Sequence, residues 1–198
     1  MKNINFKPRQ KLIVPCKSTL LVHRYAETAL SVWQRFKPEP TYVNMECINK
    51  FYRPPLRLID GGDNVFYFCN EFQRINQVLR LESDSDYPCL ITPESIKDIQ
   101  QLAWMEVIDL IFLKDAHHPD LFKALKGTAP QSVICQLMGI RYLTVKSYCR
   151  FAGISQSSYE YMQCKFTLEG RVIGLPQTPI LTTSPEKSEF HTSAFYAL

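Results

Sequence analysis

The chain has 198 residues, of which 45% are hydrophobic and 21% are charged, and its formal net charge is +4. This composition is ordinary for a folded protein and excludes a chain that is disordered throughout. No apolar run approaches the ~20 residues that span a bilayer, and the apolar patch near the N-terminus (LIVPC) is too short for a signal peptide, so we expect a cytoplasmic protein.

Charge is distributed unevenly along the chain. Residues 1–50 carry a net charge of +6, residues 51–122 carry −6, residues 123–171 carry +5, and the remaining residues carry −1. A basic block next to an acidic one indicates two surfaces with different partners, and the basic surface suits a polyanion.

The cysteines favour buried free thiols in a reducing compartment. They are odd in number, widely scattered and without a CxxC pair, and the histidines show no metal-ligand spacing with them. The seven cysteines are Cys16, Cys47, Cys69, Cys89, Cys135, Cys149 and Cys164.

The first forty residues predict one strand and one long helix. Lys11–Cys16 (KLIVPC) is strand-like. Ser18 is placed to cap a helix that runs to Phe36, and the prolines at positions 38 and 40 end it. Apolar residues recur along it at three- and four-residue spacing: Val22, Tyr25, Ala26, Ala29, Trp33 and Phe36.

Residues 41–91 predict strand, turn, strand, helix and strand. The strands are TYVNMECI with PLRLID, then VFYFC, then YPCLI after an acidic loop (ESDSD). Gly61–Asn64 (GGDN) forms the turn. The segment NEFQRINQVLRL has helical periodicity, and its apolar face comprises Phe72, Ile75, Val78, Leu79 and Leu81.

From Thr92 onward the chain predicts helices. The first helix starts at Thr92-Pro93-Glu94-Ser95, with proline in the first position. A second, shorter helix starts at His118-Pro119-Asp120 and ends near Gly127. A third helix starts at Ala129-Pro130 and ends at Gly139. We therefore predict an α+β fold. A small mixed-sheet module covers residues 1–91, an all-helical region with a possible wing covers residues 92–174, and a disordered tail covers residues 175–198.

Tyr142–Met162 (YLTVKSYCRFAGISQSSYEYM) meets the physical demands of a helix-turn-helix. Cys149 is small where the two helices meet, Gly153 can turn with a positive φ, and Ser155 can cap the second helix. Thr144 can cap the first helix in the same way. The side chains expected to face the core are Val145, Tyr148, Ala152, Ile154, Tyr159 and Met162.

The stretch LTVKSYCRFAGISQSS resembles the helix-turn-helix of excisionase-like and MerR-like DNA-binding proteins, with Cys149 in the family's alanine position. The resemblance covers residues 142–165 and implies that the second helix enters the major groove. By position, it implies base contacts from Gln156, Ser157, Ser158 and Tyr161, with Glu160 as an alternative to Tyr161. It implies phosphate contacts from Lys146, Arg150 and Lys165. KFTLEGRVIGL would form a β-hairpin wing that places Arg171 near the DNA backbone or in the minor groove.

Two alternatives accompany this interpretation. The overlapping stretch VICQLMGIRYLTVKSY satisfies the same pattern, with Cys135 and Gly139 in the equivalent places, although Ser155 favours the later register. The helices could also form an αα-corner that binds no nucleic acid.

Residues 41–91 resemble, more weakly, the N-terminal domain of ParB-type partition proteins. In that family a strand ends in a glycine-containing basic turn that enters a helix, and Cys69–Ile75 (CNEFQRI) occupies this turn. The resemblance implies a CTP site to which Arg74 would contribute. Glu71 stands where the family has glycine, and Arg74 is what remains of the basic cluster.

No GxxxxGK[ST], GxSxG or HExxH motif is present, and no cofactor or metal is expected. His117–His118 is interpreted as a polar helix cap and Asp60–Asp63 as a hairpin turn. We expect a non-catalytic, sequence-specific DNA-binding protein of bacterial or mobile-element type, either a transcriptional regulator or a partition or mobile-element accessory factor. It would act at the nucleoid as a homo-oligomer or with a protein partner. The alternatives are a protein-binding adaptor subunit and a ParB-like nucleotide-dependent switch.

Overall fold

The structure is a computed structural model that describes residues 9–14, 17–38, 55–80 and 87–172, with the backbone alone for residues 80 and 166–172. Residues 1–163 form one compact unit and residues 164–198 a second. The predicted domain boundaries after residues 91 and 174 stay predictions. The predicted strand 41–48, the acidic loop and the tail 175–198 lie outside the described residues.

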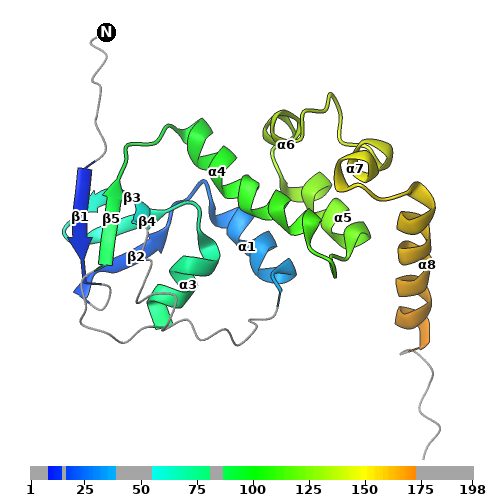
Figure 1. The fold of residues 1–198 in the computed structure, drawn as a ribbon, viewed down its shortest axis with the longest axis horizontal. Coiled ribbons are helices and arrows are strands. Elements are labelled where there is room, and N and C mark those ends of the chain that lie inside the picture. The colour runs from blue at the N-terminus through cyan, green and yellow to red at the C-terminus, as the bar shows by residue number, and fades with distance from the viewer. Residues whose placement is uncertain (1–8, 15–16, 39–54, 81–86, 173–198) are drawn as a thin grey trace, which may run out of the picture. The chain divides into compact units, whose positions relative to one another are not determined.

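A mixed five-stranded sheet organises the N-terminal half and confirms the α+β class (Figure 1). Its spatial order is β1-β5-β3-β4-β2. The pairs β1–β5 and β3–β4 are antiparallel, whereas β2–β4 and β3–β5 are parallel. The strands are β1 (Arg9–Ile13), β2 (Thr19–Val22), β3 (Leu56–Gly62), β4 (Val65–Phe68) and β5 (Tyr87–Ile91).

The predicted turn between β3 and β4 is confirmed. Gly62, Asp63 and Asn64 all have positive φ angles, of 82°, 47° and 60°. These residue types tolerate the left-handed region best, which is why this segment can reverse the chain in so few residues. The Asp60 carboxylate accepts a hydrogen bond from the Gly62 N–H at 3.0 Å.

The predicted helix from Ser18 to Phe36 is wrong in its first half. Thr19–Val22 is strand β2, and helix α1 begins only at Glu27 (Glu27–Phe36). The alternation in β2 buries Leu20 and leaves Leu21 exposed, which is strand periodicity over four residues. Pairing with β4 decided the outcome, and β4 lies more than forty residues away in the sequence.

The remaining predicted helices are present, with small corrections. Helix α4 begins after Ser95, whose hydroxyl oxygen accepts from the Asp98 N–H at 3.2 Å, so Pro93 lies outside the helix. Leu79 is 51% exposed rather than on the buried face of α3. The helices are α3 (Phe72–Arg80), α4 (Ile96–Asp109), α5 (His118–Thr128), α6 (Gln131–Leu137), α7 (Val145–Ala152) and α8 (Gln156–Val172), with a short 3₁₀ turn, η2 (Leu110–Phe112).

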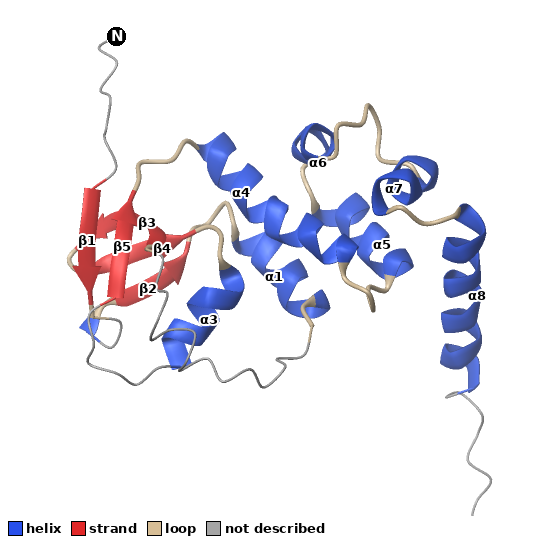
Figure 2. Cartoon of the chain, in the orientation of Figure 1, coloured by secondary structure: helices blue, strands red, loops and turns tan. Residues whose placement is uncertain are grey.

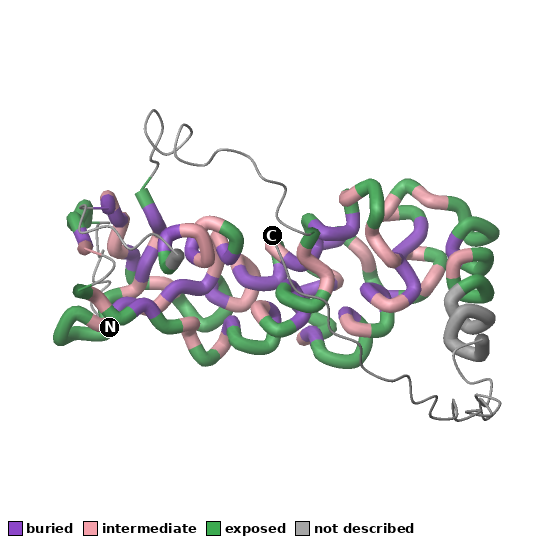
Figure 3. The backbone as a smooth tube through the Cα atoms, turned by 90° about the horizontal axis from the view of Figure 1, so that it is seen from below, coloured by how far each residue is buried: buried purple, intermediate pink, exposed green. Residues whose placement is uncertain are grey.

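The core lies between one face of the sheet and the helices. Figure 2 shows α1, α3 and α4 on one side of the strands, and α1 packs against α4. Phe72 of α3 contacts Trp33 of α1 and Phe68 of β4, with ring centroids 5.7 and 6.3 Å apart. Buried segments, purple in Figure 3, continue from the sheet into the helical region, where Trp104 is 1% exposed. Among the described residues, no helix is long and apolar enough to cross a membrane.

Candidate nucleic-acid interface

Helices α7 and α8 meet at a turn of three residues. Thr144 caps α7 in a capping box: its side-chain oxygen accepts from the Ser147 N–H at 3.1 Å, and the Ser147 hydroxyl oxygen accepts from the Thr144 N–H at 2.9 Å. Gly153 ends α7 with a φ of 68°, and the following N–H, of Ile154, donates to the Cys149 carbonyl at 3.0 Å. Ser155 caps α8 by accepting from the Ser158 N–H at 3.0 Å. The predicted helix-turn-helix geometry is therefore confirmed.

A buried aromatic cluster holds the start of α8 in place. Tyr148 of α7 and Tyr159 of α8 are 0% and 3% exposed. Both rings contact Phe122 of α5, at centroid distances of 5.4 and 6.0 Å, and they lie 6.2 Å from each other. Cys149 is also buried at the helix crossing, where a larger side chain would separate the helices.

The side chains predicted to contact DNA lie on the surface of this motif. Lys146 and Arg150 are exposed one turn apart, on one face of α7. Neither forms an ion pair with another described residue. The predicted base-contacting residues of α8, which are Gln156, Ser157, Ser158, Glu160 and Tyr161, are all exposed, the last of them 70% exposed.

The predicted wing is wrong up to residue 172, because α8 continues through Val172. KFTLE contains no glycine or proline that would stop a helix, and Gly170 is accommodated inside it. Lys165 is exposed on α8 in the second compact unit. The backbone of Arg171 is helical, and its side chain lies outside the described residues.

The earlier of the two overlapping registers has a similar cap but a longer connection. Gly139 follows α6 with a φ of 63°, and the Ile140 N–H donates to the Cys135 carbonyl at 2.9 Å. Seven residues, 138–144, then separate α6 from α7. Because a helix-turn-helix joins its helices by three or four residues, the geometry favours α7 and α8 as the pair.

His118 is a buried contact of this motif, which corrects its interpretation as a polar cap. Helix α5 begins at His118, and His117 provides no side-chain cap. The Nδ1 atom of His118 lies 3.0 Å from the Tyr148 hydroxyl, and burial, with a smaller contribution from His117, lowers the pKa of His118. No group of three described side chains is arranged to hold a metal ion.

This environment predicts that stability falls on mild acidification. In the unfolded chain the imidazole of His118 binds a proton near pH ~6.5, whereas in the folded protein it does so only at lower pH. The stabilisation gained by burying the neutral imidazole is therefore complete above pH ~6.5 and is lost as the pH falls below that value. We expect the melting temperature to drop between about pH 7.5 and 5.5. His118→Gln should show a shallower drop, and His23→Gln should act in the same direction because burial also lowers the pKa of His23. Equal slopes for the wild type and His118→Gln would contradict this assignment.

An ion pair and several hydrogen bonds connect the residues around Arg74. Glu71 has a φ of 56°, a conformation that glycine adopts more easily. The Arg74 guanidinium pairs with the Glu71 carboxylate and donates to the Tyr87 hydroxyl at 3.3 Å. The carboxylate of Glu106, on α4, accepts from the Glu71 N–H at 2.9 Å. A nucleotide phosphate would therefore compete with Glu71 for Arg74.

Glu106 acts as a cap for α3 from a different helix, and its loss should destabilise the fold. Burial raises the pKa of both Glu71 and Glu106, yet Glu106 satisfies N–H groups at the start of α3. Glu106→Ala should lower the free energy of unfolding by about 1–2 kcal/mol in urea titrations. Glu106→Gln should recover most of this because its amide oxygen still accepts. Asp109→Ala, at an exposed position on the same helix, should have little effect, and equal losses for Asp109→Ala and Glu106→Ala would argue against the cap.

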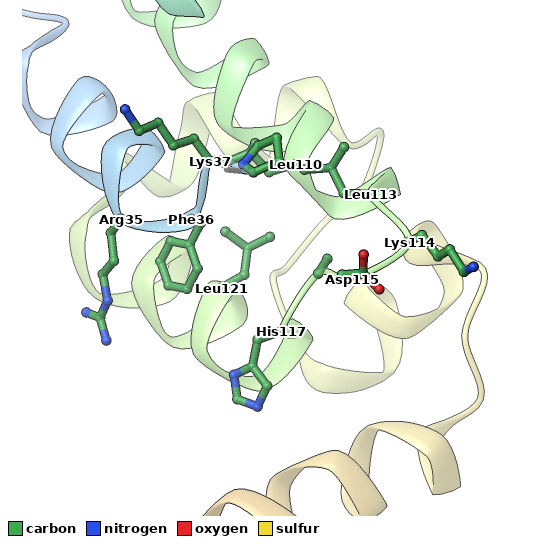
Figure 4. Close-up of a pocket in the computed structure, with 11 residues that line it drawn as sticks. Arg35, Phe36, Lys37, Leu110, Leu113, Lys114, Asp115, His117 and Leu121 are labelled. Carbon is green, nitrogen blue, oxygen red and sulfur yellow. The ribbon is translucent and has the colours of Figure 1, made fainter. Parts of the chain in front are cut away.

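A cavity that no motif indicated lies between the end of α1 and the connection from α4 to α5. It has a volume of about 450 Å³ and is lined by Phe36, Leu110 and Leu121, among others. Figure 4 shows Phe36 and Leu121 close together, while Arg35 and Lys114 point away. Its walls come from segments about 75 residues apart, so no local sequence signal could have revealed it.

Comparison with known proteins adds no family assignment to this geometry. No protein-family model matches the chain, and no curated protein or solved structure shows significant similarity to it. The fold, the capped three-residue turn and the exposed cations of α7 are therefore the observations on which a function can be based.

Proposed function

We propose that this protein binds double-stranded DNA through α7 and α8 and does not catalyse a reaction. The observation that carries the proposal is the capped three-residue turn between two helices that share a buried aromatic cluster. Next to this turn, α7 presents two cations that pair with no other described residue, and the first three residues of α8 are polar and exposed. A packing corner would need neither feature.

In the proposed complex, the N-terminal turn of α8 enters the major groove. The Gln156 amide can donate to and accept from an adenine edge, and the hydroxyls of Ser157 and Ser158 can contact bases or phosphates. Lys146 and Arg150 would contact phosphates on the flanking backbone and set the orientation of the motif. Glu160 would repel phosphates and would be tolerated only beside a cytosine amino group.

Fluorescence anisotropy with random double-stranded DNA tests the proposal. We expect dissociation constants in the micromolar range or tighter at about 50 mM salt, with a steep loss of affinity up to about 300 mM. Selection from a random pool should then enrich a motif, and Gln156→Ala should relax the preference at one position of it. Absence of binding at the low-salt end would make the motif an αα-corner.

A further inference from the structure

The connection between α6 and α7, residues 138–144, is held in place at both ends. After α6, the Ile140 N–H donates to a carbonyl in the last turn of that helix at 2.9 Å. Before α7, the Ser147 hydroxyl donates to the Tyr142 carbonyl at 2.8 Å. The backbone of Arg141 and Tyr142 lies between these two hydrogen bonds and therefore has a defined position relative to both helices.

The two side chains at this point, Arg141 and Tyr142, are exposed. The Tyr142 ring is 66% exposed, and the Arg141 guanidinium carbon lies 5.4 Å from the centroid of that ring. This distance is typical of a cation–π contact, which restricts the orientations of the guanidinium. Arg141 forms no ion pair with another described residue. Because the N–H groups of a guanidinium lie in its plane, stacking on the ring leaves them available for a phosphate.

Acidic residues are absent from the sequence around this pair. Between Asp120 and Glu160 the chain carries no Asp or Glu, and the whole of this stretch belongs to the described part of the chain. The cations in the same stretch are Lys123, Lys126, Arg141, Lys146 and Arg150. Protein surfaces normally mix both signs of charge, so this one-sided distribution indicates an anionic partner.

Arg141 lies beyond the end of α7 that carries Lys146. Because Lys146 is in the first turn of α7 and Arg150 in the last, the three cations are spread along the axis of this helix. In Figure 1 the α6–α7 connection is at the top of the helical region and the N-terminal end of α8 is the upper end of that helix, so the two lie on the same side. In a helix-turn-helix complex the helix before the recognition helix crosses the DNA backbone. A backbone that meets Lys146 is therefore also within reach of the long side chain just beyond it.

We infer that the DNA-binding surface extends from α7 onto the α6–α7 connection, where Arg141 contacts a third phosphate. Tyr142 acts as a positioning residue, because its ring holds the guanidinium in place without itself having to touch the DNA. The inference rests on the proposed DNA binding by α7 and α8, and it adds a contact from outside the helix-turn-helix. The partner is the same double-stranded DNA, with a longer contacted length of its backbone on one side of the motif.

Fluorescence anisotropy with random double-stranded DNA at several salt concentrations tests the role of Arg141. Arg141→Ala should weaken binding roughly 7-fold near 100 mM salt and lower the slope of log affinity against log salt by about 0.9. Combined with the alanine substitutions of Lys146 and Arg150, it should lower the slope by about 0.9 more than those two alone, because a separate phosphate is involved. Arg141→Lys should keep the wild-type slope and recover only part of the affinity, because an ammonium lacks the planar fork of a guanidinium.

Arg35→Ala is the matched control. Arg35 is also exposed and stacks on the aromatic residue that follows it, with 5.2 Å between its guanidinium carbon and the centroid of the Phe36 ring. It lies in the last turn of α1, outside the helix-turn-helix. Its removal changes the net charge by the same amount without removing a phosphate contact, so the affinity and the slope should stay close to those of the wild type.

Tyr142→Ala separates positioning from charge. The variant keeps Arg141 but releases its guanidinium, so binding should weaken roughly 3-fold with an unchanged salt slope. Tyr142→Phe retains the face of the ring and should bind like the wild type. Because Tyr142 is 66% exposed, neither variant should lower the melting temperature.

The outcomes distinguish this inference from the proposed function. A wild-type slope in Arg141→Ala, with the double variant of Lys146 and Arg150 still impaired, would overturn the inference alone. Equal effects of Arg141→Ala and Arg35→Ala would do the same, because they would reflect net charge and not a contact. Wild-type affinity in Tyr142→Ala would overturn the positioning role. Absence of DNA binding by the wild type at about 50 mM salt would overturn both the inference and the proposed function.

Discussion

Replacing Lys146 and Arg150 together by alanine will weaken the binding of random double-stranded DNA by roughly 50-fold near 100 mM salt. Each of these cations is exposed and pairs with no other described residue, so each is available to release counterions from a phosphate. The slope of log affinity against log salt should decrease by about 1.8, because each cation that neutralises a phosphate contributes about 0.9 to it. Anisotropy titrations at four or five salt concentrations measure both quantities.

The fall in affinity should be the same for a selected site as for random DNA, because phosphate contacts carry no sequence information. Lys97→Ala, which removes an exposed cation from α4, is the control. Its effects on the affinity and on the salt slope should both be smaller than those expected for the loss of one cation that contacts a phosphate. The melting temperature of the double variant should match that of the wild type. An unchanged slope in the double variant would exclude α7 as the phosphate-contacting helix.

Tyr159→Ala should lower the free energy of unfolding by about 3 kcal/mol, the range for the loss of a large buried aromatic side chain. Tyr159 is 3% exposed, and its ring contacts Phe122 and Tyr148, which come from two other helices. Its removal leaves a cavity and detaches the start of α8 from α5 and α7. We therefore also expect loss of DNA binding at temperatures where most of the protein is still folded.

Tyr161→Ala provides a matched control two residues along the same helix. Tyr161 is 70% exposed, so its loss should change the free energy of unfolding by less than about 0.5 kcal/mol. Because Tyr161 is a predicted DNA contact in the proposed complex, its loss should weaken binding without a change in stability. Urea titration and anisotropy on both variants separate the two roles. If Tyr161→Ala destabilised the protein as much as Tyr159→Ala, the assignment of buried and exposed faces of α8 would be wrong.

The sequence alone determined the features that depend on neighbouring residues. Thr144, Gly153 and Ser155 act on N–H and carbonyl groups within five positions of themselves, so the caps and the turn of the helix-turn-helix could be predicted. The turn at Gly62–Asn64 is local in the same sense, because it depends on which residues tolerate a positive φ. The candidate DNA contacts were implied, position by position, by the resemblance that these elements carry.

Only the tertiary structure decided the features that depend on distant segments. Thr19–Val22 is a strand because β4 is available to pair with it, and the helical spacing around it could not show this. His118 is buried because Tyr148 arrives from another helix, and the Glu71 N–H is satisfied by Glu106, 35 residues away. Contacts of this kind stabilise a conformation only after the chain has closed a long loop, and no local pattern in the sequence records which loop will close.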